Sequence, residues 1–221
     1  FLGLLPICLL AQKSDVSALF SVAKPLETKL KVSIKDIKKK TNDSTYIPAS
    51  LYIKNASGGW DSVKISVRTR GIFRRANCYF PPIRVKISKE DAKGTVLEGN
   101  KSLKLVMPCM NNDDKNTLVM KEFICYKMEE KLTPYYFNTR LVTMEFTELD
   151  GKKSKTQQLT TFFIEDDDVV AKRHNAKVME NLNLHPKGLN DTAALRHDLF
   201  QLLVANTDWS TTFLHNAKVI F

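Results

Sequence analysis

Apolar positions recur at helical spacing near the C-terminal end of the chain. Four leucines form one stripe at positions i, i+4, i+7 and i+8: Leu195, Leu199, Leu202 and Leu203. This spacing places the side chains on one face of an α-helix. We expect that face to be buried, since each leucine removed from water contributes roughly 1.5–3 kcal/mol. The helix should end at the polar residues 206–208, and the apolar residues 217–221 predict a strand.

Alternation of apolar and polar residues predicts a β-sheet over the earlier part of the chain. The predicted strands cover residues 26–35, 51–54, 63–69, 83–87, 104–107, 140–146 and 158–164. Glycines at residues 58–59 and at Gly151 favour hairpin turns between neighbouring strands. The sequence therefore predicts an antiparallel sheet within residues 14–164.

Two further helices follow from capping residues and apolar spacing. Polar residues 111–114 precede a predicted helix over residues 117–131. Its apolar side is expected to carry Leu118, Phe123, Ile124 and Met128. A shorter helix is predicted over residues 169–174. The fold class is therefore α+β, with a sheet-rich part over residues 14–164 and a helical part over residues 165–221.

The N-terminal residues 1–11 are apolar and uncharged, and a polar stretch follows them. This pattern resembles the tail of a secretory signal peptide, so residues 1–13 are interpreted as a signal-peptide remnant. The segment is too short to span a bilayer. A lipid anchor at Cys8 and a buried N-terminal strand are the alternatives. An extracytoplasmic location, whether secreted, periplasmic or at the cell surface, follows from the first interpretation.

Composition limits the function classes. The chain has 34 Lys and Arg against 24 Asp and Glu, a net charge of +10, which favours phosphates or acidic partners. We do not expect nucleic-acid binding, since no recognised nucleic-acid module is present. Cys78, Cys109 and Cys125 are an odd number without CxxC spacing, so buried free thiols are expected. The histidines show no zinc-binding spacing.

Asp208, His215 and Asn216 form a candidate catalytic group in the loop after the leucine-rich helix. In phosphoryl transfer a carboxylate orients the attacking hydroxyl, and an Asn a few residues later helps to hold magnesium. The alternative is that Asn206 and Asp208 are only helix-capping and turn residues.

Basic residues give a candidate phosphate site. Residues 68–75 contain four arginines, among them Arg70, next to Gly71, which can adopt a positive φ. In the following strand Arg84 and Lys86 alternate onto one face. Basic strands that flank a glycine-containing loop can bind phosphates. An ordinary cationic sheet face explains the same pattern.

Two glutamates have both a functional and a structural interpretation. Glu122 lies near the start of the helix over residues 117–131, where it could pair with a strand cation or be a surface residue. Glu165 begins an acidic run at a helix start, which stabilises the helix dipole. Alternatively, it lies in a connector between a sheet lobe and a helical lobe, with backbone groups available to a purine.

Four segments, in this order, resemble the CotH kinase-like family, particularly secreted members from Bacteroidetes-type bacteria. The resemblance covers about residues 26–221. The segments are VRTRGIFRRANCYFPPIRVKI, LKLVMPCMNNDDKNTLVMKEFICYKM, FFIEDDDVVAKR and ANTDWSTTFLHNAKVIF.

The resemblance implies a two-lobed protein-kinase-like fold, with an antiparallel sheet-rich N-lobe and the start of a helical C-lobe. It implies that Asp208 acts on the acceptor hydroxyl and that Asn216 assists the metal. Arg84, or alternatively Lys86, would contact the nucleotide phosphates, with Glu122 as a partner, and Glu165 would mark the hinge.

The activity implied is transfer of the ATP γ-phosphoryl group, with Mg²⁺ or Mn²⁺, to a hydroxyl of a secreted or cell-surface protein. The family has a further metal-binding Asp after the strand of residues 217–221. We therefore expect the chain to be a fragment, truncated at both ends and catalytically incomplete. The alternative is a non-catalytic, pseudokinase-like extracytoplasmic module for binding or surface assembly.

Overall fold

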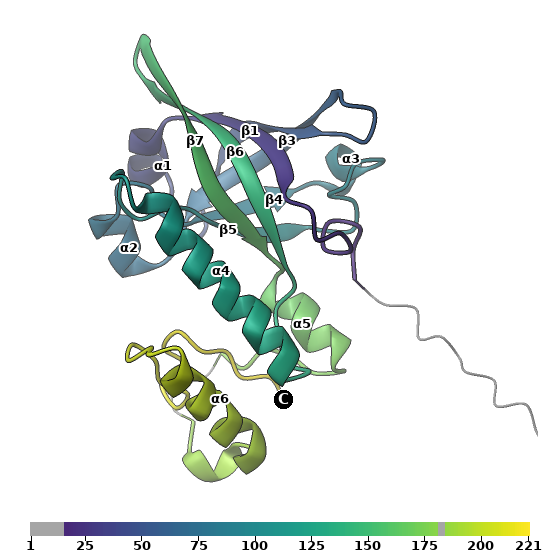
Figure 1. The fold of residues 1–221 in the computed structure, drawn as a ribbon, viewed down its shortest axis with the longest axis vertical. Helices are drawn as coiled ribbons and strands as arrows, with labels where there is room; N and C mark the ends of the chain where they lie inside the picture. The colour runs from purple at the N-terminus through teal and green to yellow at the C-terminus, as the bar shows by residue number, and fades with distance from the viewer. Residues whose placement is uncertain (1–15, 181–183) are drawn as a thin grey trace, which may run out of the picture.

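Seven strands form a closed β-barrel in the computed structural model, which describes residues 16–180 and 184–221 (Figure 1). Around the barrel the strand order is β1-β2-β3-β4-β5-β7-β6. The strands are β1 (Leu26–Val32), β2 (Ile47–Lys54), β3 (Trp60–Thr69), β4 (Ile83–Ile87), β5 (Ser102–Val106), β6 (Thr139–Asp150) and β7 (Lys153–Ile164). All neighbours are antiparallel except β1 and β6, which are parallel and close the barrel.

The period-2 pattern explains the barrel core. Alternate residues of each strand point inward, and β4, for example, buries Ile83, Val85 and Ile87 while Arg84 and Lys86 point outward. Phe80 and Phe146 are fully buried and pack edge to face, with ring centroids 5.6 Å apart. The predicted hairpins of β2 with β3 and β6 with β7 are confirmed.

Helices surround the barrel and follow it. They are α1 (Ile34–Lys40), α2 (Ile72–Asn77), α3 (Lys89–Ala92), α4 (Lys115–Leu132), α5 (Asp167–Arg173) and α6 (Asp191–Leu203), with a 3₁₀ turn η1 (Pro186–Gly188). The chain passes from β1 into α1 at Ser33. The Ser33 hydroxyl caps α1 by accepting a hydrogen bond from the Asp36 N–H at 3.2 Å.

The long helix α4 covers the outer face of β7. Val119, Phe123 and Tyr126 pack against Phe162, and both aromatic rings make edge contacts with it at about 5.5 Å between centroids. This second apolar cluster fixes α4 along the barrel (Figure 1). In that view α5 lies beside the C-terminal end of α4, and α6 lies below both.

The two-lobed kinase-like fold is therefore wrong, because the strands form one closed mixed barrel with few helices. The parallel pairing of β1 with β6, from Leu26↔Val142 to Val32↔Glu148, decides this architecture. Residues of these two strands are more than one hundred positions apart in sequence. Alternation along each strand shows which residues face the core, but it does not show which strand edges meet.

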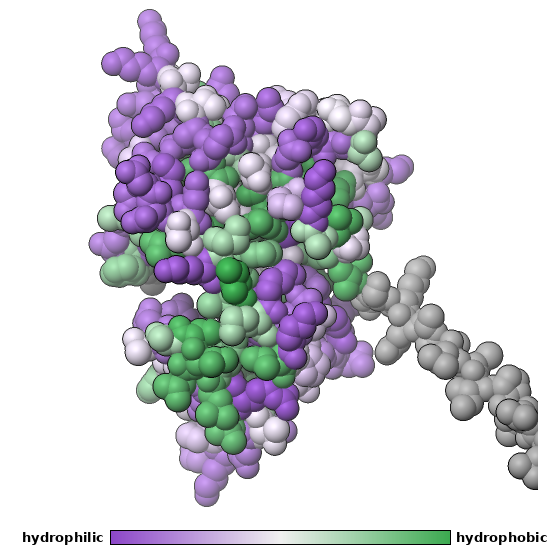
Figure 2. All heavy atoms as spheres, viewed as in Figure 1, coloured by the Kyte–Doolittle hydropathy of each residue, from purple (hydrophilic) through white to green (hydrophobic). Residues whose placement is uncertain are grey.

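The buried face predicted for α6 is wrong, and the one predicted for α4 is correct only at Phe123. The leucine stripe of α6 is exposed, from 57% at Leu199 to 75% at Leu202, and α6 buries Phe200 and Gln201 instead. In Figure 2 apolar side chains gather over this part of the molecule. On α4, Leu118, Ile124 and Met128 are exposed. Helical spacing identifies an apolar face, but only tertiary contacts decide whether another element covers it.

The two ends of the chain were also the subject of predictions. Residues 217–221 form no strand: Ile220 makes one isolated bridge to Val178, and Lys177 and Phe221 exchange backbone hydrogen bonds. The signal-peptide remnant of residues 1–13 lies outside the described residues. No helix within residues 16–180 or 184–221 is long and apolar enough to cross a membrane.

Candidate functional site

The loop after α6 is held by a chain of polar contacts. The Asn206 side chain donates to the Gln201 carboxamide at 2.7 Å, and its own Oδ1 accepts from the Asp208 N–H at 3.1 Å. Gln201 is only 8% exposed, so the start of the loop is fixed to a buried residue of α6. The turn itself includes Ala205, which has a positive φ of 54°.

Asp208 accepts hydrogen bonds from two residues further along the chain. His215 Nε2 lies 2.8 Å from Oδ1, and Asn216 Nδ2 donates to Oδ2 at 3.0 Å. A backbone bridge between Ser210 and His215 closes the loop and brings these residues back toward Asp208. The predicted pair Asp208 and Asn216 is thus brought together, although eight positions separate them. The Asp208 side chain remains 78% exposed, so a ligand can reach it.

The orientation of Asn216 bears on metal binding. Its Nδ2 also donates to the Asp208 backbone carbonyl at 2.7 Å. Because a carbonyl oxygen only accepts hydrogen bonds, the carboxamide atom that faces it is the nitrogen. The Asn216 Oδ1 accepts no hydrogen bond from a described residue and is available as an oxygen ligand. Mg²⁺ commonly takes one or two protein oxygens together with phosphates and water. Asn216 Oδ1 is an oxygen of the type that binds a nucleotide-bound cation of this kind.

A metal site made by protein side chains alone does not fit the same loop. Within the described residues, no group of three or more His, Cys, Asp or Glu side chains is arranged to hold a metal ion.

A row of cations crosses the outer face of the barrel. Arg68, Arg84 and Lys104 are direct cross-strand neighbours on β3, β4 and β5. Like charges placed opposite one another destabilise a sheet unless anions neutralise them. Asp166 pairs with Arg84, and Asp167 pairs with Lys104. The acidic run at the start of α5 thus docks on the barrel through two ion pairs.

The pKa values of these groups follow from burial and pairing. Burial works against ionisation of Asp166, but the Ser102 hydroxyl and the Arg84 guanidinium outweigh it and lower the pKa of this carboxyl. Desolvation lowers the pKa of Lys104, and the Asp167 carboxylate opposes that shift. Arg84 also donates from Nε to the Ser102 hydroxyl at 3.0 Å.

Arg70 has the least compensated charge of this region. Its Nε is buried and has no hydrogen-bond partner within the described part of the chain. Desolvation lowers its pKa, and the acids Glu122 and Asp167 are close enough to counteract the shift. A buried guanidinium donor without a partner costs free energy.

Glu165 has a structural environment. Its side chain is 3% exposed and accepts from Arg173 Nη1 at 3.0 Å and from the Asn138 backbone and side chain. The Glu165 backbone N–H donates to the Asn138 carbonyl, so that donor is not free for a purine. These contacts join β6, β7 and α5 at one end of the barrel.

The other two predicted residues lie apart from these groups. Lys86 is exposed, and its ammonium lies 5.8 Å from the centre of the Tyr46 ring. The partner of Glu122 is Arg74 of α2, at 3.7 Å, rather than Arg84 of the strand. Neither of the two cavities beside α6 is lined by Arg84, Lys86 or Asp208, and no hydrogen bond or ion pair among the described residues joins Arg84 or Lys86 to Asp208. In Figure 2, however, the outline is indented between the barrel and the α6 region, and residues 205–221 border this indentation from below in Figure 1.

Sequence reasoning missed Lys104, Asp166, Asp167 and Arg173 as parts of the charged cluster. One signal was present: Lys104 is a single cation inside the apolar strand Ser102–Val106, and an acidic run follows another strand. Lys104 meets the acidic run because β5 and β7 are neighbours in the barrel, and residue spacing does not show which strands are neighbours.

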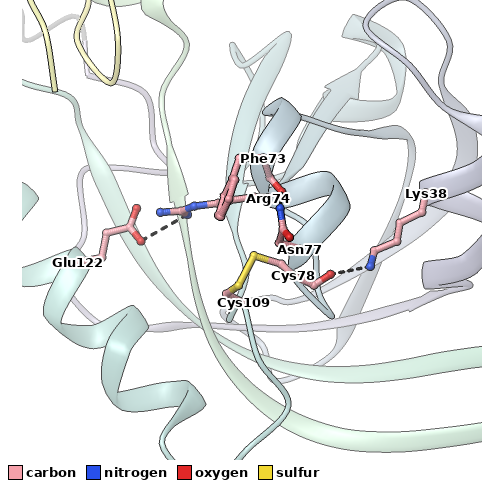
Figure 3. The surroundings of a disulfide bond; sticks show 7 residues. All are labelled: Lys38, Phe73, Arg74, Asn77, Cys78, Cys109 and Glu122. Carbon is pink, nitrogen blue, oxygen red and sulfur yellow. Dashed lines mark hydrogen bonds and ion pairs between the residues drawn. A yellow bond between two sulfur atoms is a disulfide. The ribbon is translucent and has the colours of Figure 1, made fainter. Parts of the chain in front are cut away.

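A disulfide joins Cys78 to Cys109, so the expectation of free thiols at these positions is wrong, whereas Cys125 is free (Figure 3). The bond connects the end of α2 to the loop after β5. Beside it, Lys38 donates to the Cys78 carbonyl at 2.5 Å, and Arg74 of α2 points toward Glu122 of α4. A disulfide is consistent with an oxidising, extracytoplasmic location.

Comparison with known proteins gives no relative: no protein-family model, no curated protein and no solved structure matches the chain.

Proposed function

We propose that the protein binds ATP with Mg²⁺ or Mn²⁺ and transfers the γ-phosphoryl group to a hydroxyl of a secreted or cell-surface protein. The observation that carries the proposal is the contact between Asp208 and Asn216. It joins the Asn216 carboxamide nitrogen to the Asp208 carboxylate at an exposed position of a structured loop. The resemblance to the CotH kinase-like family supports this activity, although the two-lobed fold it implied is not retained.

Each group has a defined role in the proposed reaction. The acceptor oxygen forms a bond to the γ-phosphorus while the bond from that phosphorus to the β–γ bridging oxygen breaks, and ADP leaves. Asp208 orients the acceptor hydroxyl and accepts its proton. His215 and Asn216 hold the carboxylate. The bound cation would offset negative charge on the phosphates, with Asn216 as a protein ligand.

The phosphates would bind at the cation cluster. Arg84 and Lys104 are already paired with acids, whereas the Arg70 Nε is not, so Arg70 is the position with an unused donor. The disulfide supports an extracytoplasmic location for this chemistry.

The test uses the full-length protein, labelled ATP and Mg²⁺ or Mn²⁺. Asp208→Asn should reduce phosphoryl transfer by about 10²- to 10⁴-fold, because a positioned base is lost. Asp113→Asn, an exposed aspartate before α4, is the matched control and should retain transfer. Equal transfer by Asp208→Asn and the wild type would refute the role of Asp208.

Nucleotide binding is measured separately with a fluorescent ATP analogue. Arg70→Gln should weaken binding by about tenfold or more, which corresponds to about 1.4 kcal/mol or more. Lys64→Gln removes an exposed lysine from β3 and should not change the affinity for the analogue. If Arg70→Gln binds the analogue as tightly as the control, the phosphates do not bind at this cluster.

A second candidate function is non-catalytic binding or surface assembly. The exposed leucine face of α6 favours it, because large exposed apolar patches commonly mark interaction surfaces. Light scattering of the wild type and of Leu199→Glu tests this candidate. Association that is lost in the variant, together with absence of ATP binding, would favour assembly over phosphoryl transfer.

A further inference from the structure

An open cavity of the C-terminal region is lined by the residues that follow Asp208 but does not include Asp208 itself. Its volume is about 520 Å³. One wall is a single face of α6, and the opposite wall is the segment Trp209–Thr212, which directly follows Asp208; η1 and Leu189 complete the site. A cavity of this size accommodates several amino-acid side chains.

Two carboxylates line this cavity within a strongly basic chain. Asp191 and Asp198 both belong to α6, are exposed, and form no ion pair or side-chain hydrogen bond with another described residue. They are seven residues apart, so they lie on the same face roughly 10 Å apart along the helix axis. A polyproline II peptide repeats every three residues with a rise of about 3.1 Å per residue, so its positions i and i+3 lie on one side about the same distance apart.

The rest of the lining suits the stems of basic side chains. Pro186, Leu189 and Leu195 provide apolar contact surface, and Trp209 adds an aromatic ring. His197 packs edge to face on Trp209, with ring centroids 5.4 Å apart, which fixes the indole. Lysine and arginine place their methylene stems on apolar surface and their charge beside an acid or an aromatic ring.

Thr211 also belongs to the lining, but its hydroxyl oxygen is buried and offers no contact to a ligand. The cavity therefore combines negative charge with apolar and aromatic walls.

We propose that this cavity binds a peptide segment in the polyproline II conformation that carries two basic side chains three residues apart. Asp191 and Asp198 pair with the two cations, and the stems lie against Leu195 and Trp209. As a docking site for the phosphoryl acceptor it rests on the proposed function, since Trp209 adjoins Asp208. The binding itself requires no nucleotide.

Trp209 provides a direct readout. The chain has two tryptophans, so Trp60→Phe leaves Trp209 as the only indole. The probe is the peptide acetyl-Lys-Ala-Ser-Lys-amide, titrated without ATP at low salt. Its matched control replaces both lysines with norleucine, which retains the stem and removes the charge. We expect saturable fluorescence change with the lysine peptide, and affinity that falls as salt increases.

Variants separate this site from general charge attraction. Asp191→Asn and Asp198→Asn should each weaken binding of the lysine peptide about three- to tenfold, as expected when one partly exposed ion pair is lost. Asp113→Asn removes an exposed carboxylate far along the chain and should leave affinity unchanged. Circular dichroism verifies that α6 is retained in each variant.

The outcomes are distinct. Equal affinity for the lysine and norleucine peptides, no binding of either, or unaltered binding by both α6 variants would overturn the peptide site. Peptide binding by a protein that transfers no phosphate would support the site and remove the phosphoryl-transfer proposal. Transfer to protein acceptors that is unaffected by Asp191→Asn and Asp198→Asn would show that acceptors dock elsewhere.

Discussion

The disulfide between Cys78 and Cys109 makes a quantitative prediction about stability. It closes a loop with a sequence separation of 31 residues, which contains β4, α3 and β5. In the chain-entropy account, a cross-link over such a loop stabilises the folded state by about 3–4 kcal/mol, because it restricts the unfolded chain. Replacing both cysteines with alanine should lower the free energy of unfolding by this amount.

The variant should still fold. The Cys109 carbonyl accepts hydrogen bonds from the Tyr79 N–H at 2.7 Å and the Phe80 N–H at 3.3 Å, and neither contact needs the sulfur atoms. Phe80 remains a fully buried part of the barrel core. The loss is therefore expected in stability and not in the barrel itself.

Urea unfolding followed by circular dichroism measures the difference. With a slope of about 2 kcal/mol per molar urea, the transition should move down by roughly 1.5–2 M. A reducing agent should lower the urea midpoint of the wild type to that of the double variant, and it should leave the midpoint of the double variant unchanged. Cys125→Ala is the matched control, and it should not remove the response to reduction. A double variant within about 0.5 kcal/mol of the wild type, or a wild type insensitive to reduction, would refute the disulfide.

Three further predictions concern buried charge and the two faces of α6. Burial raises the pKa of Glu129 from its ordinary 4.5 to about 7. The folded state therefore binds a proton more readily than the unfolded state, and this stabilisation is complete below pH 4.5 and lost as pH rises through 7. Glu129→Gln should flatten this fall, which amounts to at most about 3 kcal/mol, in urea unfolding measured from pH 4 to 8. Glu165→Gln leaves Arg173 without its buried anion and should cost about 3–5 kcal/mol. Phe200→Ala should destabilise by about 3–5 kcal/mol, whereas Leu202→Ala should change stability by less than about 0.5 kcal/mol, since these side chains are 8% and 75% exposed.

Each of these predictions has a contradicting result. An unchanged pH profile in Glu129→Gln would show that another group titrates. Glu180→Gln, at an exposed position, is the control for Glu165→Gln, and equal stability of the two variants would contradict the buried ion pair. A larger loss for Leu202→Ala than for Phe200→Ala would mean that α6 presents its leucine face inward.

Local features were accessible from the sequence alone. Alternation located β2, β3, β4, β6 and β7 and showed that Arg84 and Lys86 share one face, because side chains in a strand alternate strictly. The positive φ expected at Gly71 is observed at 73°. Asp208 and Asn216 were also predicted to act together, from the residue types that phosphoryl transfer requires and from the family resemblance.

Contacts between distant segments were decided only by the tertiary structure. Closure of the barrel through β1 and β6, the ion pairs that join α5 to β4 and β5, and the disulfide all connect residues far apart along the chain. The sequence also did not determine which side of α6 is buried. Helical spacing allows either the leucine stripe or the side with Phe200 to face the rest of the protein. Local periodicity depends on the backbone of one element, whereas pairing and burial depend on which elements meet.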